Sequence, residues 1–460
     1  MCFVAAAACS GKCIFRKQLF LRKSPFSAYF HFINASLCPE AAENSSGPTV
    51  IGHRQEKRLD HSSLLRRAAA RHAFAVILTN YVSTLDFVGR VDYSEGRKKK
   101  ALSDDQKEQK RIIMMYDCLK LKKFVKDIIL TTGLDEKSSE IFADSLVFAD
   151  MRGVSSHGVT RLGVYYRRLT NGRVDPKAVF EVVSERPAMM LIDGHNGMGA
   201  PLGMFAMKKC MEKAKNAGSC FAAVRGGNHF GCAGYYTIAA AKEGMIGFAI
   251  ADSNAIVAPT GSRQPMLGTN PYSIAVPAYG KEPFVLDMAT SVVANGKIKL
   301  AFKEGRPIPE GWGMDAEGHV TTDPSKVKFL MPFGGYKGYG ISMAIDLLAG
   351  VLPGASTSRN MGSFWNTEDV REQRTGFFLG CFDPAAITDP ERFMKDVSAY
   401  IDEMKAAEKA EGVDEILVAG EPEQRKFEKA LTEGVKLSGV VAGELAKVGE
   451  QAGVAFDCAM

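Results

Sequence analysis

Short apolar runs alternate with helical stretches in the chain after Pro176, and this alternation limits the folds that the chain can adopt. The runs are bounded by Gly, Pro or Asn and have the composition of β-strands: 221–224, 246–251, 272–276 and 284–288. Apolar residues at helical spacing occupy 233–243 and 292–303. Strands that alternate with helices along a chain predict a mixed α/β domain.

Helical periodicity dominates the region before this domain. Apolar residues recur at helical spacing over 119–129, and Gly133 then ends the pattern. Asp135 or Ser138 can cap a second helix that continues through Val147. We therefore expect a helical hairpin here. The tail from residue 391 onwards returns to charged helical periodicity, so helices are expected there as well.

The first 113 residues differ in composition from the rest. They hold 19 Lys and Arg against 10 Asp and Glu, whereas the remaining residues hold 39 against 42 and offer no basic field for nucleic acid. Residues 1–39 contain five bases and no acid, which is typical of an organelle transit segment. Because no apolar period persists over 55–111, the alternative is an unpacked extension or a mistaken start codon. We expect 1–113 to be poorly structured and the protein to be cytoplasmic, or located in a mitochondrion or plastid if residues 1–39 are a transit segment.

Composition and missing motifs exclude several other classes. Apolar residues make 46% and charged residues 24% of the 460, near the globular average, and no run reaches the roughly 18 uncharged apolar residues of a membrane span. The ten cysteines include no C-x-x-C pair, so reduced thiols are expected. The dinucleotide G-x-G-x-x-G, P-loop, G-x-S-x-G and H-E-x-x-H fingerprints are all absent. No two histidines after residue 113 stand at metal-ligand spacing, so no metal site is expected.

One candidate site combines an imidazole, a guanidinium and a phenol. Ser155 or Ser156 can cap a helix on which His157, Arg161 and Tyr165 follow at steps of four residues. Each step turns about 400°, so the three side chains share one stripe and can converge on a small ligand. They could move a proton, hold a carboxylate and donate a hydrogen bond. The alternative is a solvated helix face with an incidental histidine.

Two glycine-rich turns form further candidates. In 225–231 the glycines allow a ligand to approach His229 closely, just before the helix expected near Ala233, although such a histidine can also merely satisfy turn carbonyls. In 333–340 four glycines surround Lys337 ahead of an apolar helix, an arrangement that suits a pyrophosphate or carboxylate and also occurs in flexible connectors. The segment 287–291 is expected to end a strand and start a helix, with hydroxyls that meet a cofactor or act as simple caps.

Five motifs in series resemble the type-2 malate/L-lactate dehydrogenase family, which also contains ureidoglycolate and sulfolactate dehydrogenases and some ketoacid and imine reductases. The motifs are Ser156-His157-Gly158, Asn228-His229-Phe230-Gly231, Asp287-Met288-Ala289-Thr290-Ser291, Pro309-Glu310-Gly311-Trp312 and Gly335-Tyr336-Lys337-Gly338-Tyr339-Gly340. The resemblance covers roughly 340 residues, from about 115 to 454, and leaves 1–113 without a counterpart. It implies a homodimeric NAD(P)-dependent oxidoreductase with a non-Rossmann cofactor fold, in keeping with the missing dinucleotide fingerprint.

The resemblance also implies roles for residues at the matching positions. His157 and His229 are its two catalytic candidates, and Arg161 and Tyr165 line its substrate pocket. The positions that match cofactor contacts are Ser253, Asp287, Met288, Ala289, Lys337, Gly338, Gly420 and Glu421. The chain departs from the pattern at Ala419, where relatives often have Pro. In the expected mechanism His229 takes the hydroxyl proton, His157 orients or shares it, and Arg161 grips the carboxylate.

These observations lead to one set of expectations. We expect a helical substrate and dimer domain built from 114–196 and 421–460, and an NAD(P)-binding, mixed-sheet α/β domain over 197–420. The expected reaction is hydride transfer between NAD or NADP and a small 2-hydroxy/2-keto acid, with malate and oxaloacetate as the leading pair. The alternatives are ureidoglycolate, lactate or sulfolactate dehydrogenation and the reduction of a cyclic imine of the piperideine-2-carboxylate type. A catalytically inactive binding protein is the rival class. The implied homodimer would have its site near the subunit interface, without nucleic acid or membrane partners.

Overall fold

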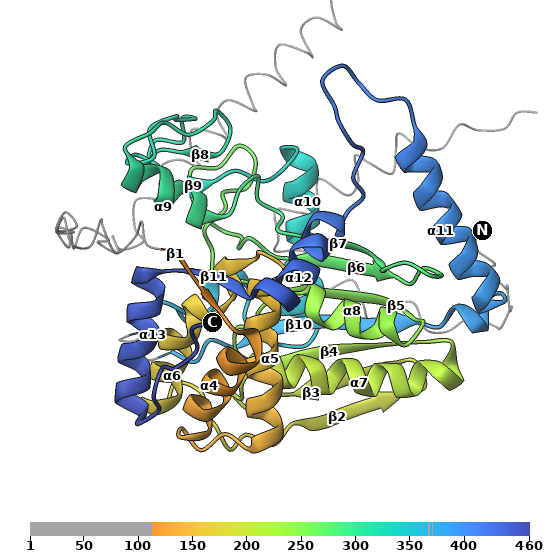
Figure 1. Cartoon of the computed structure of the whole chain (residues 1–460), viewed down its shortest axis with the longest axis horizontal. Coiled ribbons are helices and arrows are strands. Elements are labelled where there is room, and N and C mark those ends of the chain that lie inside the picture. The colour runs from red at the N-terminus through yellow and green to blue at the C-terminus, as the bar shows by residue number, and fades with distance from the viewer. Residues whose placement is uncertain (1–112, 367–368, 370) are drawn as a thin grey trace, which may run out of the picture. The chain divides into compact units, whose positions relative to one another are not determined.

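The computed structural model of the chain describes residues 113–366, 369 and 371–460 (Figure 1). Internal contacts divide the chain into residues 1–98 and 99–460, and every described residue belongs to the second unit. The expected extension, apart from Ile113, and the expected transit segment over 1–39 lie outside the described residues. Of the described helices, none is long and apolar enough to cross a membrane.

A seven-stranded mixed sheet forms the centre of the described unit. The alternation of runs and helices predicts a mixed α/β domain of this kind, but it indicates only four of the seven strands. Only the β3–β4 pair is parallel, with the crossover helix α7 (Gly199–Ala217) between the two strands, and the other neighbours are antiparallel. Three predicted strands match the structure residue for residue, and the fourth lies within a longer strand. The spatial order is β2 (Glu181–Arg186), β3 (Met189–Asp193), β4 (Ser219–Gly227), β10 (Thr375–Phe382), β5 (Ile246–Ala251), β6 (Tyr272–Val276) and β7 (Phe284–Met288).

Helices cover both faces of this sheet (Figure 1). Alternate side chains of a strand point to opposite faces, so Phe377 of β10 packs with α7 and with α8 (Gly234–Lys242). Its neighbour Phe378 packs on the other face, beside Ile345 of α10 (Tyr336–Ile345) and Ala349 of the π-helical segment η3 (Asp346–Val351). Each face therefore has its own apolar layer.

The two ends of the described chain share a second hydrophobic core. The expected hairpin is present as α4 (Cys118–Leu130) and α5 (Glu136–Met151), and Asp135 caps α5 by accepting the N–H of Ser138. Strand β1 (Ile113–Tyr116) pairs with β11 (Val435–Ser438). Leu121 and Phe124 of α4 belong to the same core as Leu445 of α13 (Gly439–Ala452), which follows α12 (Glu421–Glu433).

The remaining elements are short or peripheral. Helix α9 (Asn295–Glu304) and the strands β8 (Gly313–Met314) and β9 (Phe329–Leu330) form a lobe beside α10 (Figure 1). Helix α11 (Pro390–Ala406) begins with an Asp389 cap. Single 3-10 turns form at η4 (Ser358–Asn360) and η5 (Pro384–Ala386). The six cysteines in the described part of the chain are free thiols.

Two sequence-based predictions of helices are wrong in detail. The continuous helix expected from Ser155 is broken at Gly158, whose backbone is extended, into η1 (Ser155–His157), η2 (Val159–Arg161) and α6 (Leu162–Thr170). No helix begins directly after the 287–291 segment, because α9 starts only at Asn295. Thr290 and Ser291 are buried there, and their hydroxyls donate to the backbone oxygens of Asn270 and Val293. They brace a loop instead of capping a helix.

Candidate active site

The two histidines singled out in the sequence lie face to face. His157 comes from η1, and His229 comes from the loop between β4 and α8. Their ring centroids are 5.5 Å apart and their planes differ by 21°. Both side chains are only partly buried. Although η1, η2 and α6 replace the expected single helix, they still bring His157 to the same place as Tyr165.

Tyr165 contacts His229 directly. Its hydroxyl oxygen lies 2.5 Å from Nδ1 of His229, and the N–H of Gly231 donates to the same Nδ1 at 3.2 Å. A backbone N–H can only donate, so this geometry favours the neutral tautomer whose proton sits on Nε2. The Tyr165 hydroxyl can also accept a proton from Nδ1, so the site can support the opposite tautomer as well.

An aromatic pair that the sequence did not indicate lines the same site. The ring of Phe364 stacks on His229 at 4.7 Å and meets Tyr165 edge-on at 5.3 Å. The guanidinium carbon of Arg161 lies 4.0 Å from the ring of Trp365 and 5.5 Å from that of Phe364. Arg161 also donates through Nε to the carbonyl of Ser156 at 2.5 Å. The guanidinium is therefore held beside the imidazoles by one hydrogen bond and two rings.

Buried polar residues hold the loop that carries His229. Gln373 accepts the backbone N–H of His229 at 3.1 Å. Asn228 accepts from Arg168 at 3.1 Å and donates to the carbonyl of Gly197 at 2.9 Å. Asn228, Arg168 and Gln373 are each no more than 2% exposed. Sequence reasoning missed Arg168, although an arginine three residues after Tyr165, on the same helix face, could have signalled it. No sequence pattern pointed to Gln373.

Burial and nearby positive charge set the protonation states of the site. Burial lowers the pKa of His157 to about 4, and the charge of Arg161 adds to this effect. Burial, followed by the charges of His157 and two arginines, holds the pKa of His229 well below its usual range. Burial raises the pKa of Tyr165. Near neutral pH the site therefore contains two uncharged imidazoles, a protonated phenol and a cationic guanidinium.

Hydrogen bonds between loops join most of the segments expected to bind a cofactor. The N–H of Ser253 donates to the side chain of Asn270 at 3.0 Å, and the hydroxyl of Thr290 donates to the Asn270 carbonyl at 3.0 Å. The N–H of Phe333 donates to the Thr290 carbonyl, also at 3.0 Å. Ser253, the segment that follows Asp287 and the loop before α10 are therefore neighbours.

The start of α10 has the features of an anion cradle. Gly334 and Gly335 have positive φ values of 57° and 64°, and no atom lies within 4 Å of where a Cβ would stand on either. No side chain caps α10, and Lys337 in its first turn is exposed. Gly338 packs directly on the carbonyl of Phe333. Open backbone, an uncapped helix N-terminus and a lysine together fit the diphosphate of a dinucleotide.

Asp287 links this region to the histidine loop. Its Oδ2 accepts the N–H of Gly234 at 2.9 Å and the thiol of Cys232 at 3.0 Å. Met288 and Ala289, which follow it, are partly buried. The carboxylate of Asp287 thus fixes the start of α8, directly after the loop that presents His229.

The last two residues expected to contact a cofactor, Gly420 and Glu421, lie beside β7. Gly420 has a φ of 88° and packs against Val285, and its carbonyl accepts from Arg152 at 3.3 Å. The carboxylate of Glu421 pairs with Lys405 at 2.5 Å. Gly420 and Glu421 therefore lie beside β7, but they take no part in the hydrogen bonds that join Ser253 to α10.

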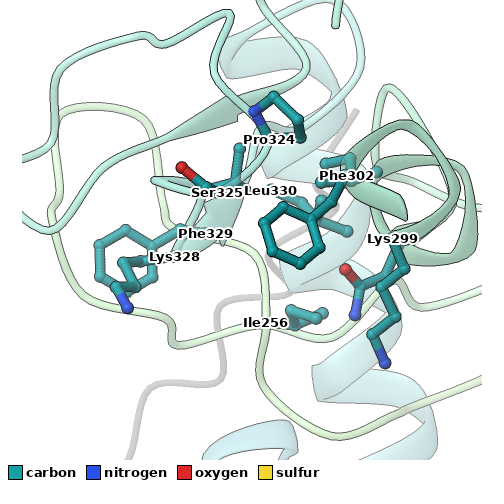
Figure 2. A pocket seen from close by; sticks show the side chains of 11 residues that line it. Ile256, Lys299, Phe302, Pro324, Ser325, Lys328, Phe329 and Leu330 are labelled. Carbon is teal, nitrogen blue, oxygen red and sulfur yellow. The ribbon is translucent and has the colours of Figure 1, made fainter. Parts of the chain in front are cut away.

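A pocket of about 290 Å³ lies in the lobe formed by α9 and β9 (Figure 2). Figure 2 shows Lys299 and Phe302 on one side and Lys328 and Phe329 on the other. The ammonium nitrogen of Lys299 is 5.6 Å from the ring of Trp365, which also contacts the guanidinium of the histidine site. Trp365 therefore connects this pocket with the histidine pair. In the described part of the chain, no group of three His, Cys, Asp or Glu side chains is placed to hold a metal ion.

Comparisons with known proteins give a consistent picture. The family profile described as Malate/L-lactate dehydrogenase matches residues 117–446. The malate dehydrogenase of Pyrococcus horikoshii is 38% identical over 341 residues, which are 72% of this chain and 93% of that protein. The L-sulfolactate dehydrogenase of Methanocaldococcus jannaschii is 40% identical over 306 residues, 66% of this chain and 88% of that protein. The solved structure of the sulfolactate dehydrogenase from Methanocaldococcus jannaschii matches with a TM-score of 0.71 at 36% identity, covering 74% of this chain and 98% of that one.

The names of two further relatives include a cofactor. Ureidoglycolate dehydrogenase (NAD(+)) of Escherichia coli strain K12 is 30% identical over 318 residues, 69% of this chain and 90% of that protein. The (2R)-3-sulfolactate dehydrogenase (NADP(+)) of Chromohalobacter salexigens is 33% identical over 261 residues, 56% of this chain and 77% of that protein. Relatives of this chain thus include proteins named for each nicotinamide cofactor.

Proposed function

Because this chain belongs to the malate/L-lactate dehydrogenase family, we propose that it transfers a hydride between NAD or NADP and a small 2-hydroxy/2-keto acid, with malate and oxaloacetate as the leading pair. The observation that carries the proposal is the stacked pair of His157 and His229, with Tyr165 on Nδ1 of His229 and Arg161 alongside. This constellation offers a proton carrier and a carboxylate-binding cation within one small space.

His229 carries the proton in this mechanism. In keto-acid reduction the protonated ring of His229, which carries hydrogens on both nitrogens, donates its Nε2 proton to the keto oxygen, where negative charge develops, and is left neutral with its hydrogen on Nδ1. In the oxidation direction the ring proton sits on Nδ1 and is accepted by the Tyr165 hydroxyl, so Nε2 is free to take the substrate's hydroxyl proton. The lowered pKa keeps His229 neutral, which the base requires. His157, stacked on it, orients or shares the proton.

Arg161 grips the substrate carboxylate. Its Nε donates to the carbonyl of Ser156, and stacking on Trp365 fixes the plane of the guanidinium. The two remaining nitrogens are therefore oriented for two-point binding of a carboxylate. A second cation lies over the same indole, because the ammonium nitrogen of Lys299 is 5.6 Å from the centroid of the Trp365 ring. Two cations beside one indole suit an acid with a second anionic group, such as malate or sulfolactate, better than lactate.

A bound NAD or NADP supplies the acceptor or donor of the hydride. Lys337 and the open backbone at the start of α10 would hold its diphosphate. Ser253 and Thr290, which follows the 287–289 segment, both form hydrogen bonds with Asn270, and Thr290 also accepts the N–H of Phe333 just ahead of that cradle. Gly420 and Glu421 would add contacts beside β7.

We further propose that two copies of the chain form a dimer with the site near the interface. The segment from α10 to the residue that follows η3 carries apolar side chains that are between 38% and 69% exposed. The start of this segment also belongs to the proposed cofactor cradle. An exposed apolar stripe of this kind on the surface of a single chain is typical of a protein interface. Its residues are Tyr336, Ile341, Met343, Leu347, Leu348, Val351 and Leu352.

A substrate panel tests the proposed function. The full chain is mixed with NADH or NADPH, cofactor fluorescence is followed, and oxaloacetate, pyruvate, sulfopyruvate, oxalurate and Δ1-piperideine-2-carboxylate are then added singly. We expect binding of at least one cofactor, followed by loss of its absorbance with one of the keto acids. Cofactor binding without turnover across the whole panel would support the inactive binding protein. Turnover of the cyclic imine alone would move the assignment to an imine reductase.

A further inference from the structure

The turn that carries His157 is anchored to the end of α5 by a buried carboxylate. Asp150, in the last turn of α5, is 8% exposed, and its Oδ2 accepts the N–H of Val159 at 2.7 Å. Val159 is the first residue of η2, which leads directly into α6. The carboxylate therefore caps this helical run from a neighbouring helix and not from within its own sequence.

Gly158 lets the carboxylate and the turn touch. A Cβ at this position would lie 2.2 Å from three atoms of the Asp150 carboxyl group, a distance that only a glycine permits. Gly158 separates His157 from Val159, so the backbone on both sides of it is fixed against α5. Any movement of Asp150 would be passed on to His157 without a side chain in between.

The groups that depend on this anchor are those of the proposed reaction. His157 precedes the capped run, Arg161 ends its first turn and Tyr165 lies in the next. Resting on the proposed function, we propose that Asp150 is a positioning residue: through the Val159 N–H it holds His157 and Arg161 in place against His229 and Trp365. It touches neither the substrate nor the cofactor.

The second carboxyl oxygen argues against a merely stabilising role. Oδ1 of Asp150 is buried and accepts no well-formed hydrogen bond from the described residues, although the Ser155 hydroxyl lies close enough to the carboxyl group to lower its pKa. A buried oxygen without a partner weakens a fold, so a cap that served stability alone would gain from exposure. Asp135, at the other end of α5, is such a cap, because it accepts the Ser138 N–H at 3.0 Å from an exposed position.

Steady-state kinetics of four variants of the full chain test the proposal, with oxaloacetate and NADH as the first probe pair. Asp150→Ala should lower kcat/KM for the keto acid about 10²-fold, because a displacement of about 1 Å can cost that much, and should leave NADH affinity unchanged. Asp150→Asn, which keeps an oxygen facing Val159, should recover most of this loss. Val159→Pro removes the N–H that donates to Asp150, at a first helical position where proline is tolerated. It should lower kcat/KM to the same extent as Asp150→Ala. Asp135→Ala is the matched control and should change thermal stability only.

Fluorescence of Trp365 provides a readout that does not require turnover. The chain has two tryptophans, so each variant is made in a Trp312→Phe background. Because Arg161 stacks on Trp365, Asp150→Ala and Val159→Pro should raise acrylamide quenching of the indole, whereas Asp135→Ala should not. If the parent protein turns over no substrate but quenching responds as expected, the proposed function fails and the positioning of Arg161 stands.

Two results would overturn the proposal. In the first, Asp150→Ala has a lower melting temperature than the parent, as expected for Asp135→Ala, but its kinetic constants and its acrylamide quenching stay within twofold of the parent. The other is that Val159→Pro, which keeps the carboxylate, is indistinguishable from the parent in both assays. This second variant decides the question if Asp150→Ala does not fold.

Discussion

The hydroxyl of Tyr165 lies 2.5 Å from Nδ1 of His229 and joins two parts of the chain with separate hydrophobic cores. Tyr165 belongs to the core that the two ends of the described chain share, and His229 follows a strand of the central sheet. Phe364, from a third segment, packs against both rings. The site is therefore assembled where distant segments meet, and its chemistry depends on how each is held.

His229→Ala should lower kcat about 10² to 10⁴-fold, the usual worth of general acid–base catalysis, because the proton carrier is lost. NADH affinity should change little. Both are measured by steady-state kinetics and by fluorescence titration. His195→Ala is the control, since His195 is exposed and pairs with Glu181 of β2, the strand at the edge of the central sheet. Near-normal turnover in His229→Ala would transfer the proton-carrying role to His157.

Tyr165→Phe should lower kcat about fivefold, which corresponds to a net hydrogen-bond contribution of about 1 kcal/mol. The phenyl ring keeps the edge contacts with Phe142 and Phe364, so the fold should be retained. The kinetic effect is compared with that of Tyr166→Phe, a neighbouring tyrosine whose hydroxyl donates to the carbonyl of Gln451. Equal turnover in Tyr165→Phe and the parent would exclude the hydroxyl from proton transfer.

Lys337→Ala should raise the dissociation constant for NADH or NADPH more than it lowers kcat, because the lysine is proposed to neutralise cofactor phosphate without touching the reacting atoms. The effect should shrink as salt concentration rises. Lys326→Ala serves as control, since Lys326 is an exposed lysine that pairs with Asp323. An unchanged cofactor titration would remove Lys337 from the binding site.

Local signals predicted much of the fold. Strands β5, β6 and β7 were predicted with their observed bounds, because each is a short apolar run closed by turn residues on both sides. Of the two residues that could cap the second helix, Asp135 and Ser138, Asp135 is the cap in the structure, and such caps are predictable because they depend on residues three apart. The helix over 155–165 failed because the spacing of polar residues ignores the backbone that Gly158 adopts against Asp150.

Long-range contacts explain what the sequence could not reveal about the site. His157, Arg161 and Tyr165 could be grouped because they are close in sequence. Phe364 and Gln373 come from a loop without periodicity or motif, and only the fold places them against His229. The same holds for the pocket between α9 and β9, whose walls come from segments far apart in the chain.

The protonation of His157 should appear in the pH dependence of stability. Its pKa is about 4 in the folded protein, against 6.5 as the ordinary value, so the unfolded chain binds more protons between these pH values. The free energy of unfolding should therefore fall as the pH drops from about 6.5 to about 4, and this part of the fall should be missing in His157→Gln. Asp150, whose pKa burial raises to about 7, acts with the opposite sign, but it is present in both proteins. Denaturant unfolding at a series of pH values checks this, and parallel curves for parent and variant would contradict it.

Charge in the apolar stripe of α10 and η3 should separate the proposed dimer. Leu347→Glu and Val351→Glu each place a carboxylate on a side chain that is about half exposed in the single chain, and burying an unpaired charge between two copies is costly. Both variants should elute as monomers in size-exclusion chromatography with light scattering, whereas Ile387→Glu, an exposed apolar residue outside the stripe, should not. If the site lies near the interface, the monomeric variants should also lose turnover, and that loss should lessen as protein concentration rises and the dimer re-forms. Monomers with full turnover would place the site wholly within one subunit, and a parent protein that is itself monomeric would remove the dimer proposal.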